Sequence, residues 1–99
     1  MSLTEKQKDD TRQELKENLD KAGVSIEETA AALGTTEDYI MQLLRLEPRR
    51  LEDTWILKNY LIEKVREAGK TPTEFTALGG DYHVIWFLDA HYIDGKKIF

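Results

Sequence analysis

A chain of 99 residues with 40% hydrophobic and 33% charged side chains is expected to form one globular domain with a modest core. Its net charge is −5. Proteins that bind nucleic acid over much of their surface are usually basic, so any nucleic-acid contact of this chain has to be local. The absence of cysteine excludes disulfides, thiolate zinc sites and a cysteine nucleophile.

The first predicted helix covers residues 4–22. Thr4 and Gln7 have the spacing of a capping box at its start, and Gly23 is typical of the residue that ends a helix. Apolar residues recur at helical spacing only in its second half. We therefore expect the second half to pack on the core and the first half to extend into solvent.

Residues 25–46 predict a helix-turn-helix. Two helices that cross closely need a small residue midway along the first helix, and Ala30 stands there. The turn needs a residue that tolerates a left-handed conformation, which Gly34 supplies. The inward positions are apolar: Ile26, Leu33, Ile40 and Leu43.

The boundaries of these two helices also follow from the sequence. Ser25, with Glu28 three positions later, predicts the start of the first. Thr35 or Thr36 starts the second, and Pro48 marks its end because a proline ring cannot continue a helix interior.

Residues 51–69 predict the strongest helix, which we expect to be central. Its apolar stripe is broad enough to pack on more than one side. The stripe consists of Leu51, Trp55, Ile62 and Val65, widened by Ile56, Leu57, Tyr60 and Leu61. Four polar residues are left for solvent: Glu52, Asn59, Glu63 and Arg66.

Residues 71–99 form an aromatic-rich C-terminal segment that we expect to be helical. Thr71, Pro72 and Glu74 predict the start of a short helix that Gly79 closes. Residues 82–93 favour a last helix, although their β-branched and aromatic content leaves a strand open. The predicted fold class is all-α, one domain of five to six helices.

The chain resembles a small uncharacterised bacterial family, a domain of unknown function with an N-terminal helix-turn-helix. The resemblance rests on Ala30 with Leu33-Gly34, on the block 55–61, on Thr71-Pro72 with Phe75 and Leu78, and on Trp86-Phe87. It implies an all-helical fold and a bacterial, cytoplasmic protein. It brings no activity and no functional residues.

Localisation follows from what the sequence lacks. The first 23 residues are densely charged, without the apolar stretch of a signal peptide. The longest apolar run, residues 84–88, is far too short to span a bilayer. We expect a cytoplasmic protein.

The first functional hypothesis is a small DNA-binding transcriptional regulator. On the second helix of the motif, Thr36, Gln42 and Arg45 face outward, where they can contact bases or phosphates. Arg49 and Arg50 follow that helix and are candidates for phosphate contact, or for pairing with nearby acids. Because one short helix seldom binds DNA tightly, this hypothesis implies a homodimer.

The alternative is a protein-interaction module that uses the helix-turn-helix as a scaffold. Glu37 and Asp38 lie in the first turn of the second helix, where such helices usually meet bases. Residues 24–44 contain no lysine or arginine. This composition suggests an acidic docking face for a basic partner, although acids in a first turn also complement the helix dipole. DNA binding is still the preferred hypothesis, because the motif is more often a DNA reader than not.

No residue pattern indicates an enzyme, a cofactor or a metal. There is no nucleophile beside a base and no phosphate-binding glycine loop. Asp81 with His83 and Asp89 with His91 repeat an Asp-x-His spacing, but the two histidines are two helical turns apart. Five C-terminal aromatics complete the core or form a dimer surface: Tyr82, Trp86, Phe87, Tyr92 and Phe99.

Overall fold

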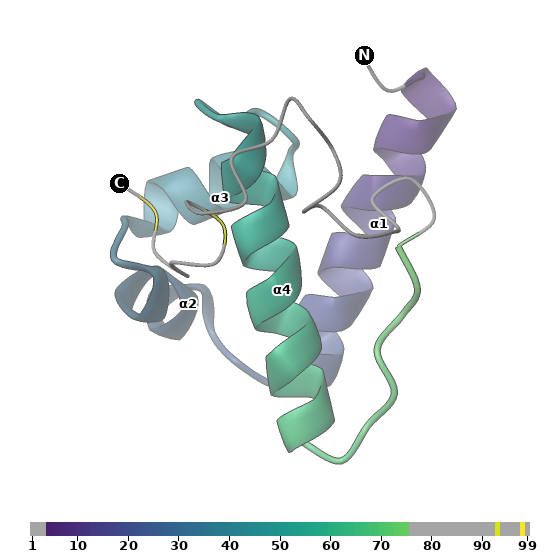
Figure 1. Cartoon of the computed structure of the whole chain (residues 1–99), viewed down its shortest axis with the longest axis vertical. Coiled ribbons are helices and arrows are strands. Elements are labelled where there is room, and N and C mark those ends of the chain that lie inside the picture. The colour runs from purple at the N-terminus through teal and green to yellow at the C-terminus, as the bar shows by residue number, and fades with distance from the viewer. Residues whose placement is uncertain (1–3, 76–92, 94–97, 99) are drawn as a thin grey trace.

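The computed structural model describes residues 4–75, 93 and 98, and in this part every regular element is a helix (Figure 1). The helices are α1 (Glu5–Ala22), α2 (Ile26–Leu33), α3 (Glu37–Leu44) and α4 (Leu51–Glu67). The largest contact joins α1 and α4, which run in the same direction, while α2 and α3 pack on one another beside them. The all-α prediction is confirmed, with four helices described where five to six were expected.

Local capping fixes the first two helices as the sequence predicts. The Thr4 hydroxyl accepts the Gln7 N–H, and the Gln7 side chain accepts the Thr4 N–H. Ser25 and Glu28 form the same reciprocal pair at the start of α2. Gly34 ends α2 with φ 74°, a left-handed conformation that favours glycine.

The start of α3 is Thr36 rather than Thr35, because the Thr36 hydroxyl accepts the N–H three residues on. Helix α3 ends at Leu44, two residues inside the predicted range 25–46 and four before Pro48. Leu46 adopts a left-handed φ of 59° and donates its N–H to the carbonyl of Leu43. The next N–H pairs with the carbonyl of Gln42, so the backbone itself closes the helix.

Helix α4 is the centre of the core. Residues 53–58 are all buried, so this part of the helix is covered on every side, and packing on more than one side is confirmed. Sequence periodicity placed Glu63 and Arg66 in solvent correctly, whereas Glu52 and Asn59 are half-buried. The buried polar residues of α4 were not anticipated: Asp53, Thr54 and Lys58.

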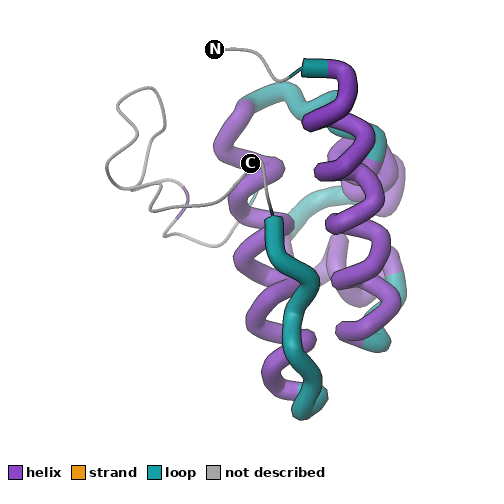
Figure 2. The backbone as a smooth tube through the Cα atoms, turned by 90° about the vertical axis from the view of Figure 1, so that its right-hand side faces the viewer, coloured by secondary structure: helices purple, strands orange, loops and turns teal. Residues whose placement is uncertain are grey.

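The segment after α4 runs back along the helices (Figure 2). Residues 71–75 are not helical, so the predicted helix start at Thr71 is wrong over these positions. The fully buried Asn18 of α1 explains why: its amide donates to the Thr73 carbonyl (3.0 Å) and accepts the Thr73 N–H (2.9 Å). Lys21 donates to the Thr71 carbonyl, and Phe75 is buried. These hydrogen bonds between distant parts of the chain outweigh the helix start that the local sequence predicts.

The other C-terminal predictions lie outside the described residues. These are the rest of the short helix, the choice between helix and strand at 82–93, and the packing of the five C-terminal aromatics. Among the described helices, none combines the length and apolar content needed to cross a bilayer.

Candidate interaction surface

The outward face of α3 lies opposite its buried side. Tyr39, Ile40 and Leu43 point into the core. The exposed positions are Thr36, Glu37, Asp38, Met41 and Arg45, and Gln42 is half-buried. Met41, at 45% exposure, is the one exposed large apolar side chain in the described part of the chain. We call this surface the α3 face.

Carboxylates at the start of the α3 face have no cationic partner among the residues that the structure describes. Glu37 and Asp38 form no ion pair or side-chain hydrogen bond within the described residues, and neither does Glu27 on α2. Thr36 turns its hydroxyl back to cap the helix. The positive end of the α3 dipole partly compensates these acids, by about 0.3–1 kcal/mol each. Their negative charge still projects into solvent.

The three arginines near the end of α3 are engaged locally, although all are exposed. Arg45 pairs with Glu47 (3.3 Å) and Arg50 with Glu52 (3.4 Å). The Arg49 guanidinium lies 4.0 Å from the centroid of the Tyr39 ring. Exposed ion pairs of this kind contribute about 0–1 kcal/mol to stability. These weak contacts orient the arginines and leave them able to exchange partners.

A buried polar cluster fixes the connection between α3 and α4. The Tyr39 hydroxyl donates to the carboxylate of Asp53, which is 1% exposed, and accepts the Arg49 N–H at 2.9 Å. Burial raises the pKa of Tyr39, as does its hydrogen bond to Asp53, while Arg49 opposes the rise. The sequence placed Asp53 only among the nearby acids that could pair with Arg49 and Arg50. The spacing of Tyr39 and Asp53 on separate helices carries no local signal of their contact.

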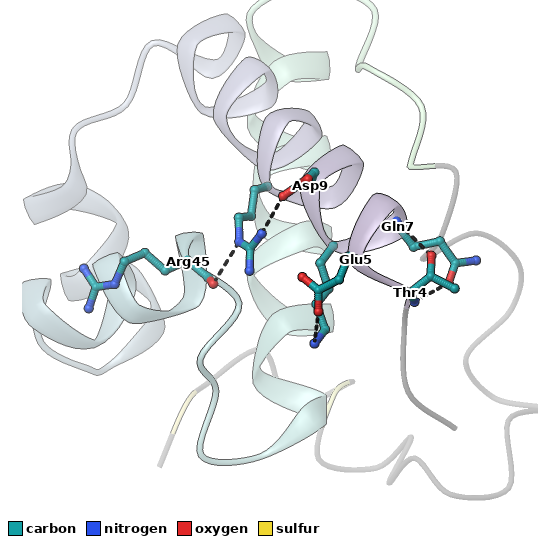
Figure 3. Close-up of polar contacts among 7 residues, drawn as sticks. Thr4, Glu5, Gln7, Asp9 and Arg45 are labelled. Carbon is teal, nitrogen blue, oxygen red and sulfur yellow. Dashed lines mark hydrogen bonds and ion pairs between the residues drawn. The ribbon is translucent and has the colours of Figure 1, made fainter.

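The end of α3 is also tied to α1. Arg12 donates from Nε to the Arg45 carbonyl (3.2 Å) and from Nη1 to Asp9 (2.8 Å). Figure 3 draws both contacts, with Asp9 and Arg45 labelled. The α3 face is therefore held at its C-terminal end by a neighbouring helix as well as by the core.

Lys58 on α4 is a second polar residue that sequence reasoning missed. Its side chain is 8% exposed, and its Nζ lies 4.6 Å from the centroid of the Trp55 ring and 5.8 Å from that of Phe75. Burial lowers the pKa of Lys58. The aromatic rings partly replace the water that the ammonium has lost.

The candidate metal ligands Asp81, His83, Asp89 and His91 lie outside the described residues. Within residues 4–75, 93 and 98, no three acidic or histidine side chains gather as a metal site would require.

The described residues define a small all-helical fold with an acidic α3 face. Residues 1–89 match the family described as an uncharacterized protein conserved in bacteria (DUF2316), and the chain belongs to this family. The resemblance to an uncharacterised bacterial family is thus confirmed. Comparisons with curated proteins and with solved structures found no match.

Proposed function

We propose that α2 and α3 form a helix-turn-helix motif that serves as a protein-interaction module and docks a basic partner on the α3 face. The turn supports the motif, because Gly34 ends α2 in a left-handed conformation and Thr36 begins α3 within two residues. Ala30, buried midway along α2, provides the small residue that a close crossing needs.

One observation supports a basic protein as the partner. Glu37 and Asp38 are exposed, lack cations among the described residues and stand one helical turn from the exposed Met41. Methionine adapts its shape to different apolar surfaces, and unpaired carboxylates attract and orient a cationic partner. The matching ligand is a protein segment that presents an apolar side chain beside lysines or arginines.

DNA binding is the second candidate, favoured by the same motif and by the exposed Arg49 and Arg50 just beyond it. Gln42 and Arg45 would then meet base edges, and a homodimer would double the contact. The exposed carboxylates of Glu37 and Asp38 at the start of α3 count against this candidate, since a recognition helix usually meets the bases with its N-terminal residues.

A photo-crosslinking amino acid at position 41 in bacterial cells tests the proposal. We expect one or a few basic proteins to be captured, and the Glu37→Lys/Asp38→Lys double variant to abolish their capture. The Glu67→Lys/Glu74→Lys variant is the control, because it makes the same charge change at exposed positions away from α3. Equal capture by both double variants would refute an acidic docking face.

A titration against random duplex DNA at several salt concentrations tests the second candidate. DNA binding requires affinity that falls as salt rises, with a shallower salt slope for Arg49→Ala/Arg50→Ala. Light scattering of the native chain would test the homodimer. Absence of DNA binding at low salt would dismiss the second candidate without affecting the first.

A further inference from the structure

Lys58 of α4 is a buried lysine whose amine reaches solvent only at its tip. The residue is 8% exposed, and its Nζ forms no hydrogen bond or ion pair with any described residue. Every fully buried side-chain nitrogen or oxygen in this part of the chain has a hydrogen-bond partner. The unpaired Nζ is therefore not fully buried. The side chain is covered along its length and open at its end.

Two aromatic rings line this side chain. The ring centroid of Trp55, on the same helix, lies 4.6 Å from Nζ, and that of Phe75 lies 5.8 Å away. Both aromatic residues are buried, and the hydrogen bonds between Asn18 and Thr73 hold the segment that ends in Phe75. The rings attract an ammonium group, but they provide no acceptor for its three N–H donors.

This environment favours the neutral amine of Lys58. Withdrawing an ammonium group from water without a counter-charge costs free energy, and burial accordingly lowers the pKa of Lys58. No acid among the described residues lies within ion-pair distance of Nζ to oppose this effect. The neutral amine is the nucleophilic form of lysine, and desolvation is one way in which proteins activate it. A surface lysine, with a pKa of about 10.4, is almost wholly protonated at neutral pH.

We propose that Lys58 is a modification site that accepts an acetyl group from a small acyl phosphate. The neutral Nζ attacks the carbonyl carbon of acetyl phosphate, and a carbon–nitrogen bond forms. The bond between that carbon and the phosphate oxygen breaks, inorganic phosphate leaves, and the nitrogen passes one proton to water. The product is an uncharged amide with one N–H donor in place of three.

The surroundings of Lys58 select this chemistry. With 8% of the residue exposed, a small reagent can reach Nζ more readily than the active site of a modifying enzyme can. Methylation would keep the positive charge that burial penalises, whereas acylation removes it. The site goes beyond the proposed docking of a basic protein, because Lys58 and its two rings belong to α4 and the returning segment and not to the α3 face.

Acetylation of the native chain by acetyl phosphate, measured peptide by peptide with mass spectrometry, tests the proposal. Two other lysines are internal controls. Lys64 also lies near an aromatic ring on α4 but pairs with Glu67, and Lys70 is exposed. At neutral pH we expect the initial rate at Lys58 to exceed the rates at both controls by about threefold or more. In concentrated urea this excess should disappear, because unfolding removes the burial.

The pH dependence of the rates separates an activated amine from a merely accessible one. The rate at Lys58 should level off at a lower pH than the rate at Lys70, because the Lys58 amine loses its proton earlier. A rate at Lys58 no higher than those of the controls in the folded chain would overturn the proposal. So would a plateau at the same pH as that of Lys70, or an excess that persists in urea.

Discussion

The hydroxyl of Tyr39 joins α3, the following loop and α4, so the Tyr39→Phe variant isolates one atom that three elements share. The change keeps the ring under the Arg49 guanidinium, because phenylalanine preserves the aromatic face. It removes the hydrogen bond to the Asp53 carboxylate and the acceptor of the Arg49 N–H. No cavity larger than one oxygen atom results.

The expected loss of stability follows from these two bonds. A hydrogen bond to a charged group contributes about 1.5–3 kcal/mol, and a neutral one about 0.5–1.5 kcal/mol. Asp53 is 1% exposed, so water does not replace the donor fully. We expect Tyr39→Phe to lower the free energy of unfolding by roughly 2–4 kcal/mol, a large part of the 5–15 kcal/mol typical of a domain.

Urea unfolding followed by tryptophan fluorescence measures the effect, since Trp55 is buried. With an m-value of about 1–3 kcal/mol/M, the midpoint should fall by roughly 0.7–4 M. Tyr60→Phe is the matched control. Tyr60 is half-buried on α4, and its hydroxyl forms no hydrogen bond with a described residue. Its midpoint should change by less than about a quarter as much as that of Tyr39→Phe.

Equal midpoints for the two tyrosine variants would refute the reasoning. They would mean that the contact with Asp53 contributes nothing beyond ring packing, and that the connection between α3 and α4 is held by apolar contacts alone.

Three further predictions use paired variants or paired conditions. Asn18→Ala should lower the free energy of unfolding in urea by roughly 2–4 kcal/mol, because it leaves backbone groups of the 71–75 segment unpaired. Lys21→Ala should lower it by less than about 0.5 kcal/mol. Thr36→Ala removes a helix cap and should cost about 1 kcal/mol, and a cost for Thr35→Ala as large would contradict the assigned cap. Burial lowers the pKa of Lys58, so the unfolded chain binds the Lys58 proton more tightly than the folded chain does. The free energy of unfolding should therefore rise as pH increases toward about 10.4, the ordinary lysine pKa. Lys58→Met should lack this part of the rise in pH-dependent thermal unfolding, and an unchanged profile would contradict the assignment.

The sequence predicted those parts of the fold that depend on neighbours within one helical turn. Capping pairs such as Ser25 with Glu28 form from residues three apart and need no tertiary partner. The broad apolar face of α4 likewise predicted a helix that packs on several sides, and the structure confirms it. The inward residues of α2 and α3 could be named for the same reason, although Ile26 is only half-buried.

The failures arose where a distant residue outweighs a local signal. Thr71 and Pro72 are a sound helix start, yet Asn18 offers the backbone around Thr73 a pair of hydrogen bonds from another helix. The end of α3 is a local case: Leu46 occupies a left-handed position that glycine usually takes, so the sequence carries no glycine to mark the end at Leu44.

The sequence could predict which residues make up the α3 face. It could not predict which of the nearby side chains contact one another. Periodicity identified which residues of α3 face outward, including Glu37 and Asp38. It could not show that Arg49 stacks on Tyr39, because that contact depends on the path of the loop between α3 and α4.

The pairing of Asn18 with Thr73 has a consequence for the order of folding. The two residues are 55 positions apart, so their pairing needs a long-range closure of the chain, whereas the capped helices need only contacts between near neighbours. The helices and their nearest-neighbour contacts are thus expected to form before the rate-limiting barrier, with the returning segment docking after it. In stopped-flow measurements, Asn18→Ala should then accelerate unfolding while leaving the refolding rate nearly unchanged.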